Sequence, residues 1–156
     1  MNVWLRPATP LDAGQAGAIL HRFQQDTSWM PKEHSGAEAI SFCDQMIAKG
    51  WVSVAEVETH RRIVGFMAQD GAEICALYLT AEARGQGIGK AFLARAKAAS
   101  PSLKLWTFQA NTGAQRFYLR EGFVEVQRTD GAANGEGLPD VEYHWPPKQG
   151  ESDHEP

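Results

Sequence analysis

Three apolar runs joined by short turns lie in the middle of the chain, and they constrain its fold more than any other feature. The runs are of strand length and cover Trp51–Val57, Ile63–Gln69 and Ala72–Leu79. The first connection is the short segment Thr59–Arg62, and the second contains Asp70-Gly71, a dipeptide typical of tight hairpins. Strands connected in this way pair antiparallel. This half of the chain therefore lacks the alternating βαβ order of a dinucleotide-binding fold.

The segments on either side of these runs alternate between helical and strand patterns. Before them, a strand and two helices are predicted at Val3–Arg6, Leu11–Phe23 and Ala37–Lys49. After them, the predicted elements are a helix, a strand, a helix and two strands, at Ile88–Ala99, Leu103–Phe108, Thr112–Glu121, Phe123–Arg128 and Val141–Trp145. The order β-α-α-β-β-β-α-β-α-β-β predicts an α/β (α+β) fold with a mixed, mostly antiparallel central sheet and helices on both faces.

The length of the chain favours a single domain. Its 156 residues are enough to bury a substantial core. Hydrophobic residues make up 43% and charged residues 22%, as in an ordinary soluble globular protein. The segment that follows Trp145 is polar and contains proline. We therefore predict one domain over residues 1–146 and a flexible polar tail over residues 147–156.

The charge distribution gives no support for nucleic-acid binding. The formal net charge is -4, and the basic triplet His60-Arg61-Arg62 falls in an evident turn, where we expect an exposed hairpin tip. No apolar run approaches the length of a membrane span, and the N-terminus lacks the apolar region of a signal peptide. We predict a cytoplasmic protein with no nucleic-acid or membrane partner. The two cysteines, Cys43 and Cys75, are expected to be buried thiols.

The stretch Ala83–Leu93, ARGQGIGKAFL, places a glycine at every second position directly before a helical pattern. Gly85, Gly87 and Gly89 permit a tight turn that leaves backbone N–H groups uncovered by side chains. The following helix adds its own unpaired N–H groups and the positive end of its dipole. This arrangement predicts an anion site, and phosphate is the usual anion.

Three kinds of phosphate-binding loop compete for this stretch. A Walker loop would need a glycine where Arg84 stands and a hydroxyl where Ala91 stands. A dinucleotide fingerprint lacks its third glycine in either register. The remaining pattern, R/Q-x-x-G-x-G/A, is satisfied by Arg84, Gly87 and Gly89.

With this loop and two further segments, the chain resembles the GNAT superfamily of N-acetyltransferases over nearly its whole length. EICALYLTAEARGQGIG is similar to the family's fourth strand and pyrophosphate loop, although Ala81 stands where the family often has proline. LWTFQANTGAQRFYLREGFVEV is similar to its second signature, N-x(6)-Y-x-x-x-G-F. The resemblance implies acetyl-CoA as cosubstrate, with its pantetheine arm paired to main-chain groups of the fourth strand. The cofactor-binding residues that it implies are Leu77, Leu79, Arg84, Gly85, Gln86, Gly87, Gly89, Lys90 and Asn111.

The resemblance also implies direct transfer of an acetyl group to an amine, with Tyr118 as general acid. A phenol, with an ordinary pKa of about 10, is protonated at neutral pH and can give its proton to the CoA thiolate. The amine arrives mostly as ammonium, so a base must accept a proton first. Glu73 is the candidate base, and His34, His144 and water are alternatives. Because no base is unambiguous, a non-catalytic acyl-CoA-binding regulatory module is the alternative function.

The sequence does not identify the amine that accepts the acetyl group. In the family it is set by the first two helices and by the segment between the last strands, here Phe23–Glu38 and Asp130–Asp140. Trp29 and Met30 favour an apolar wall for a small-molecule or peptide amine. Acidic residues in these segments could attract a cationic amine, and they are Glu33, Glu38 and Asp140. The histidines lack metal-ligand spacing, so no metal is predicted, and exposed strand edges are compatible with a homodimer.

Overall fold

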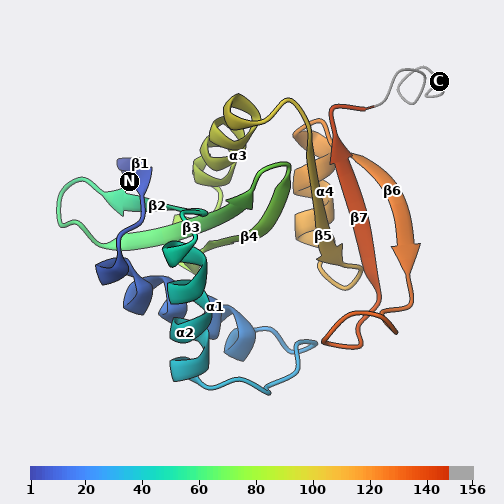
Figure 1. The fold of residues 1–156 in the computed structure, drawn as a ribbon, viewed down its shortest axis with the longest axis horizontal. Coiled ribbons are helices and arrows are strands. Elements are labelled where there is room, and N and C mark those ends of the chain that lie inside the picture. The colour runs from blue at the N-terminus through green and yellow to red at the C-terminus, as the bar shows by residue number, and fades with distance from the viewer. Residues whose placement is uncertain (148–156) are drawn as a thin grey trace. The chain divides into compact units, whose positions relative to one another are not determined.

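The computed structural model describes residues 1–147, and its strands form one seven-stranded sheet in the order β1-β2-β3-β4-β5-β7-β6 (Figure 1). The strands are β1 (Val3–Pro7), β2 (Val52–Val57), β3 (Ile63–Asp70), β4 (Glu73–Leu79), β5 (Leu103–Phe108), β6 (Val124–Thr129) and β7 (Asp140–Trp145). The helices are α1 (Ala13–Asp26), α2 (Gly36–Ala48), α3 (Ile88–Ala99) and α4 (Thr112–Arg120). This is the predicted element order, with two short 3₁₀ helices added, η1 (Pro10–Asp12) and η2 (Ala81–Ala83).

Pairing within the sheet is mixed and mostly antiparallel, as predicted. β1 pairs with β2, β2 pairs with β3, and β5 and β6 both pair with β7, all in antiparallel orientation. β4 pairs with β5 in parallel, at Glu73↔Lys104, and α3 lies in the connection between these two strands. Parallel neighbours need a crossover of this kind. The crossover explains why a loop and a helix, rather than a hairpin turn, follow β4.

The chain divides into two compact units, which are described separately. The first contains Met1–Asp70 and Cys75–Arg95, and the second contains Gly71–Ile74 and the described residues from Ala96 onward. Both β4 and α3 therefore contribute residues to each unit. A single domain over residues 1–146 stays a prediction. Of the predicted tail, residues 148–156 lie outside the described residues.

In the first unit, α1 and α2 lie side by side and cover one face of the strands (Figure 1). Their core includes Leu20 of α1, Cys43 of α2 and Phe66 of β3. The other face of β3 carries Gly65, where an added Cβ atom would lie 3.4 Å from Cε2 of Phe92. Phe92 belongs to α3, so helices cover both faces of the strands in this unit, as the sequence predicts.

Local sequence fixes the ends and the close approach of these two helices. α2 begins at a capping box in which Ser35 Oγ accepts from the N–H of Glu38 at 3.1 Å and Glu38 Oε1 accepts from the N–H of Ser35 at 3.2 Å. It ends before Gly50, which has a φ of +77°. α1 contributes Gly17, where a Cβ atom would come within 2.5 Å of Ile40. Only glycine allows α1 and α2 to pack this closely.

In the second unit, α4 has the ends that the sequence predicts. Asn111 Oδ1 accepts a hydrogen bond of 3.0 Å from a backbone N–H in the first turn, and Gly122 follows the helix with a φ of +94°. The helix buries Tyr118, whose ring packs against Phe123 and Tyr143 with centroids 5.5 and 6.1 Å apart. These ring contacts fix α4 to β7 and to the start of β6.

Two expectations from the sequence are wrong. α1 begins at Ala13 rather than Leu11, because η1 precedes it, and the Leu11 side chain is 93% exposed. Cys75 is exposed, because alternation along β4 directs Ala76 and its alternate neighbours into the core under α1 and α2. Cys43 is buried as expected, and burial raises the pKa of its thiol to about 11.

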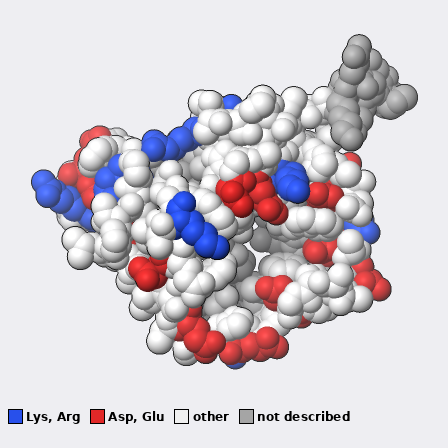
Figure 2. Space-filling view, viewed as in Figure 1, with Lys and Arg blue, Asp and Glu red and all other residues white. Residues whose placement is uncertain are grey.

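Acidic and basic side chains are interspersed on the face of the molecule drawn in Figure 2. The triplet His60-Arg61-Arg62 is an exposed hairpin tip, as predicted, and Arg61 adopts a φ of +61° there. Within residues 1–147, no helix combines the length and the apolar character that crossing a bilayer requires.

Candidate active site

The glycine-rich loop of the first unit adopts a backbone that requires glycine. Gly85 has a φ of +73° and Gly87 a φ of +82°, a region that residues with a Cβ atom rarely adopt. A Cβ atom at either position would meet nothing within 4 Å. The glycines are therefore needed for the path of the chain, and the space beside them is open.

The loop and the first turn of α3 present a row of backbone donors. The six N–H groups of Gly85–Lys90 donate to no acceptor within residues 1–147, and the first bond of the helix runs from the N–H of Ala91 to the carbonyl of Gly87 at 3.0 Å. Unpaired N–H groups at a helix N-terminus, together with the helix dipole, attract anions. This geometry is what a phosphate group requires.

Some of the polar side chains around the loop form hydrogen bonds or ion pairs with other parts of the chain, and others are exposed. Gln86 Nε2 donates to the carbonyl of Glu82 at 2.7 Å, which fixes Gln86 to η2. The Glu82 carboxylate in turn lies 3.5 Å from the guanidinium of Arg62. Arg84 and Lys90 are exposed on either side of the glycines. Two cations therefore flank the row of N–H groups.

A cavity of about 420 Å³ in the first unit brings two of the predicted cofactor-binding residues together. Leu79, at the end of β4, and Arg84, at the start of the loop, both line it. The remaining wall comes from one side of α1 with Phe23, from the residue after α1, from Arg62 and the start of β3, and from Thr80 and η2. Thr80 belongs to no motif, and the sequence indicates Phe23 only as the first residue of the predicted acceptor segment Phe23–Glu38.

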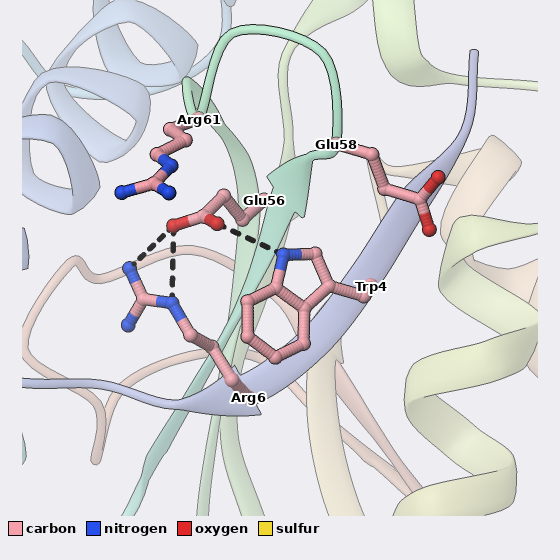
Figure 3. A pocket seen from close by; sticks show the side chains of 5 residues that line it. All are labelled: Trp4, Arg6, Glu56, Glu58 and Arg61. Atoms are coloured by element: carbon pink, nitrogen blue, oxygen red, sulfur yellow. Dashed lines mark hydrogen bonds and ion pairs between the residues drawn. The ribbon is translucent and has the colours of Figure 1, made fainter.

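A second cavity of the first unit, about 620 Å³ in volume, lies where β1 and β2 pair (Figure 3). Figure 3 shows Trp4, Arg6 and Glu56 pointing toward one another. Trp4 Nε1 donates to Glu56 Oε2 at 2.8 Å, and Arg6 donates to Glu56 Oε1 from Nε at 3.1 Å and from Nη2 at 2.9 Å. The polar groups at the centre of this cavity therefore bind one another.

Arg6 extends this network to η1. Its guanidinium donates to both carboxylate oxygens of Asp12, at 2.8 and 3.0 Å, and Asp12 also accepts from the N–H of Thr9 at 2.8 Å. The hydrogen bonds from Arg6 hold the pKa of Asp12 below its ordinary value. The pKa of Glu56 is also lowered, mainly by its hydrogen bonds from Arg6 and to a smaller extent by the one from Trp4. The network joins β1, β2 and the entry to α1, which is a structural role.

The second unit contains the other predicted residues, Asn111, Tyr118 and Glu73. Asn111 uses its side-chain oxygen to cap α4, which leaves its amide nitrogen as the remaining donor. Tyr118 is 8% exposed and belongs to the aromatic group of α4 and β7. Glu73 opens β4, is partly buried and lies opposite Lys104 in the backbone register of β4 and β5. Their roles in chemistry stay predictions.

The histidines that were considered as alternative bases each contact a carboxylate. His34 Nδ1 lies 3.3 Å from Glu38 Oε2 on the exposed side of α2, and His144 Nε2 lies 3.1 Å from Glu142 Oε2. Burial raises the pKa of Glu142, but hydrogen bonds from Gln127 and His144 outweigh it and leave that pKa below its ordinary value. Each histidine thus has a local electrostatic partner.

Two of the three acidic residues predicted to attract the acceptor have structural partners. Glu38 completes the capping box of α2. Asp140 is buried and accepts from Thr129 Oγ1 and, at 3.1 Å, from Asn134 Nδ2. The described residues contain no group of three or more histidine, cysteine or acidic side chains that could hold a metal ion.

The fold and the loop together define an acetyltransferase of the GNAT type, and comparison with known proteins agrees. The chain belongs to this family: the model of the acetyltransferase (GNAT) domain matches residues 48–125, half of the chain. The chain is 35% identical over 80 residues to the peptidyl-lysine N-acetyltransferase YjaB of Salmonella typhimurium. That match covers 51% of this chain and 53% of the relative, so the chain spans about half the length of the curated relative.

Solved structures share the fold over most of the chain. The apo form of YjaB from Escherichia coli superposes with a TM-score of 0.76 at 23% identity, and covers 93% of this chain and 98% of its own. A phosphinothricin acetyltransferase from Sinorhizobium meliloti, solved in complex with acetyl-CoA, gives a TM-score of 0.73 at 21% identity, with 94% and 89% covered. The fold prediction is thereby confirmed.

Proposed function

We propose that the protein transfers an acetyl group from acetyl-CoA to the side-chain amine of a lysine in a peptide or protein. The observation that carries this proposal is the row of unpaired N–H groups at Gly85–Lys90 in a chain of the GNAT family. These donors suit the pyrophosphate of acetyl-CoA, and Arg84 and Lys90 add charge-assisted contacts. The pantetheine arm would lie along β4, against the main chain of Leu77 and Leu79.

The chemistry needs a group that accepts a proton from the acceptor amine and a group that donates one to the departing sulfur. Acetyl-CoA supplies an activated thioester, whose C–S bond breaks as the C–N bond to the acceptor forms. Glu73, or a water molecule, accepts a proton from the incoming ammonium so that the amine can attack. Tyr118 donates a proton to the departing sulfur, and its phenolate recovers a proton from the acceptor nitrogen as the amide forms. Asn111 holds the cofactor at the start of α4 through its amide nitrogen.

Two observations support a lysine acceptor. The curated relative is named a peptidyl-lysine N-acetyltransferase. In this chain, Phe23 contacts Trp29 edge-on with centroids 6.3 Å apart and contacts Tyr78 of β4 at 5.1 Å. An aromatic wall of this kind suits the alkyl stem of a lysine side chain. The stem of the lysine would pack on these rings while its amine is still protonated.

The proposal is tested first by titration calorimetry of the full chain with acetyl-CoA, with NAD and ATP as controls. We expect micromolar binding of acetyl-CoA alone. Acetylation is then followed by mass spectrometry on two peptides, one with a lysine and a blocked N-terminus, the other with a free N-terminus and no lysine. Modification of the lysine peptide is expected. Binding without modification of any amine would identify a non-catalytic acyl-CoA-binding module, and absence of binding would overturn both functions.

The role of Tyr118 is tested by Tyr118→Phe. At saturating acetyl-CoA we expect turnover to fall by roughly 10- to 1,000-fold with little change in cofactor affinity, because a general acid acts in the chemical step. Tyr143→Phe is the matched control, since Tyr143 belongs to the same ring cluster and is 1% exposed. Equal turnover of Tyr118→Phe and the wild type would remove Tyr118 from the mechanism.

A further inference from the structure

Thr80 carries a buried hydroxyl that has no hydrogen-bond partner in the described part of the chain. The residue follows β4 directly, and its backbone is fixed by a hydrogen bond of 2.8 Å from its N–H to the carbonyl of Val64. A buried polar atom without a partner is unfavourable, and such atoms are few in folded proteins. The buried hydroxyl of Thr80 therefore needs a physical explanation.

Thr80 lies on the wall of the 420 Å³ cavity, between the two residues expected to contact the cofactor from that cavity. Leu79 precedes it and Arg84 follows η2. On the α1 side, the cavity is lined by the apolar side chains of Ile19 and Phe23. Four of the five charged side chains of the wall pair with one another, Arg22 with Asp26 and Arg62 with Glu82. Apolar groups beside a hydroxyl that has no partner suit an alkyl chain that carries amide groups.

We propose that Thr80 is a cofactor-binding residue, whose hydroxyl forms a hydrogen bond with an amide of the pantetheine arm in the cavity beside α1. The inference rests on the proposed function. A threonine hydroxyl both donates and accepts, so it can pair with either polar atom of an amide. Because the oxygen is buried in the ligand-free chain, the side chain turns about χ1 on binding, which exchanges the places of its hydroxyl and methyl groups.

This arrangement has a consequence for stability. In the ligand-free protein the hydroxyl forgoes its hydrogen bonds to water and gains none from the chain. Valine has nearly the same shape and no polar atom to satisfy. Thr80→Val should therefore stabilise the free protein while it weakens cofactor binding, whereas a hydroxyl with a purely structural role would show the opposite sign in stability.

The experiment measures the Kd of acetyl-CoA and the Tm of the ligand-free full chain for the wild type, Thr80→Val and Thr80→Ser. We expect Thr80→Val to raise the Kd about five- to tenfold, the loss given by one neutral hydrogen bond. Its Tm should be unchanged or up to about 4 °C higher. Thr80→Ser, which keeps the hydroxyl, should bind acetyl-CoA within about twofold of the wild type.

Two controls make each outcome decisive. Gln24→Met removes the other buried polar atom without a partner, one that does not line the cavity, and should leave the Kd unchanged. Adenosine 3′,5′-bisphosphate lacks the pantetheine arm, so its affinity should be the same for the wild type and Thr80→Val. An unchanged Kd of acetyl-CoA for Thr80→Val, equal weakening of both ligands, or a lowered Tm would overturn the inference. A wild type that does not bind acetyl-CoA would instead refute the proposed function.

Discussion

The two cavities of the first unit differ in how their polar groups are satisfied. In the cavity where β1 and β2 pair, the central groups bind one another: Arg6 contacts both Glu56 and Asp12, and Trp4 completes the set. In the cavity beside α1, Arg22 pairs with Asp26 and Arg62 with Glu82. The hydroxyl of Thr80, however, has no partner within residues 1–147, and the adjoining loop offers a row of free N–H groups. The central polar groups of the larger cavity are hydrogen-bonded to one another, whereas the smaller cavity and its loop keep donors that have no acceptor in the described residues.

This difference indicates which cavity is built for a ligand. Polar groups that satisfy each other raise the stability of the free protein and have little left to offer a ligand. Unsatisfied groups lower that stability and gain their partners on binding. Cavity volume alone would favour the other region. Substitutions on the two sides should therefore affect different quantities, stability on one and affinity on the other.

The largest expected effect is on affinity, from Gly87→Glu in the loop. A carboxylate placed beside the pyrophosphate should weaken acetyl-CoA binding by about 100-fold or more, since a like-charge contact costs several kcal/mol and each 1.4 kcal/mol is about tenfold. Gly50→Glu is the matched control, because Gly50 also has a positive φ and open space around it. Both variants should lose similar stability, measured by Tm, and only Gly87→Glu should lose affinity by calorimetry. Undiminished affinity of Gly87→Glu would refute the phosphate assignment.

The second prediction concerns the paired cavity. Arg6→Met leaves two carboxylates, those of Asp12 and Glu56, without their cationic partner, so the Tm at pH 7 should fall by roughly 5–10 °C. The Kd of acetyl-CoA should stay within twofold, because none of the residues of the network lines the cavity beside α1 or belongs to the loop motif. The measurement is thermal unfolding with a parallel titration. A large loss of affinity without a lower Tm would mean that the network at β1 and β2 serves acetyl-CoA binding rather than stability.

The smallest effect is a pH dependence of that stability difference. Arg6 holds the pKa of Asp12 and Glu56 below the ordinary value, so their stabilisation is present above the unfolded-state pKa near 4 and is lost as the pH falls through the lower folded-state pKa. The Tm gap between the wild type and Arg6→Met should therefore be several degrees smaller at pH 3 than at pH 7. A gap that widens in acid would mean that the carboxylates are not the source of the stabilisation.

Most of the fold could be predicted because its signals are local. Turn dipeptides, the Asn111 cap and the glycine after α4 depend on a few neighbouring residues, and each is found where the sequence places it. The errors concern long-range packing. Pro10 starts a separate short turn that removes Leu11 from the helix, and the face of β4 that meets α1 and α2 cannot be known until those helices are in place.

The candidate site could be predicted from the sequence only where the backbone forms it. The glycine pattern encodes positive φ at Gly85 and Gly87, and this conformation exposes the N–H groups. Side chains such as Thr80 and Phe23 follow no motif, since their position depends on how α1 packs over the end of β4. The candidate base is the extreme case: a carboxylate is an ordinary residue, and only its surroundings could assign it a role.

The contrast between the two cysteines provides the native chain with a ready site for chemical labelling. Cys43 is buried with a thiol pKa of about 11, whereas Cys75 is exposed on β4, two residues from Leu77. Because the thiolate is the reactive form, a thiol reagent at neutral pH should modify Cys75 and spare Cys43. A spectroscopic probe can thus be attached to the strand expected to hold the cofactor without any substitution. For the same reason, assays that detect released CoA with a thiol reagent would also count Cys75.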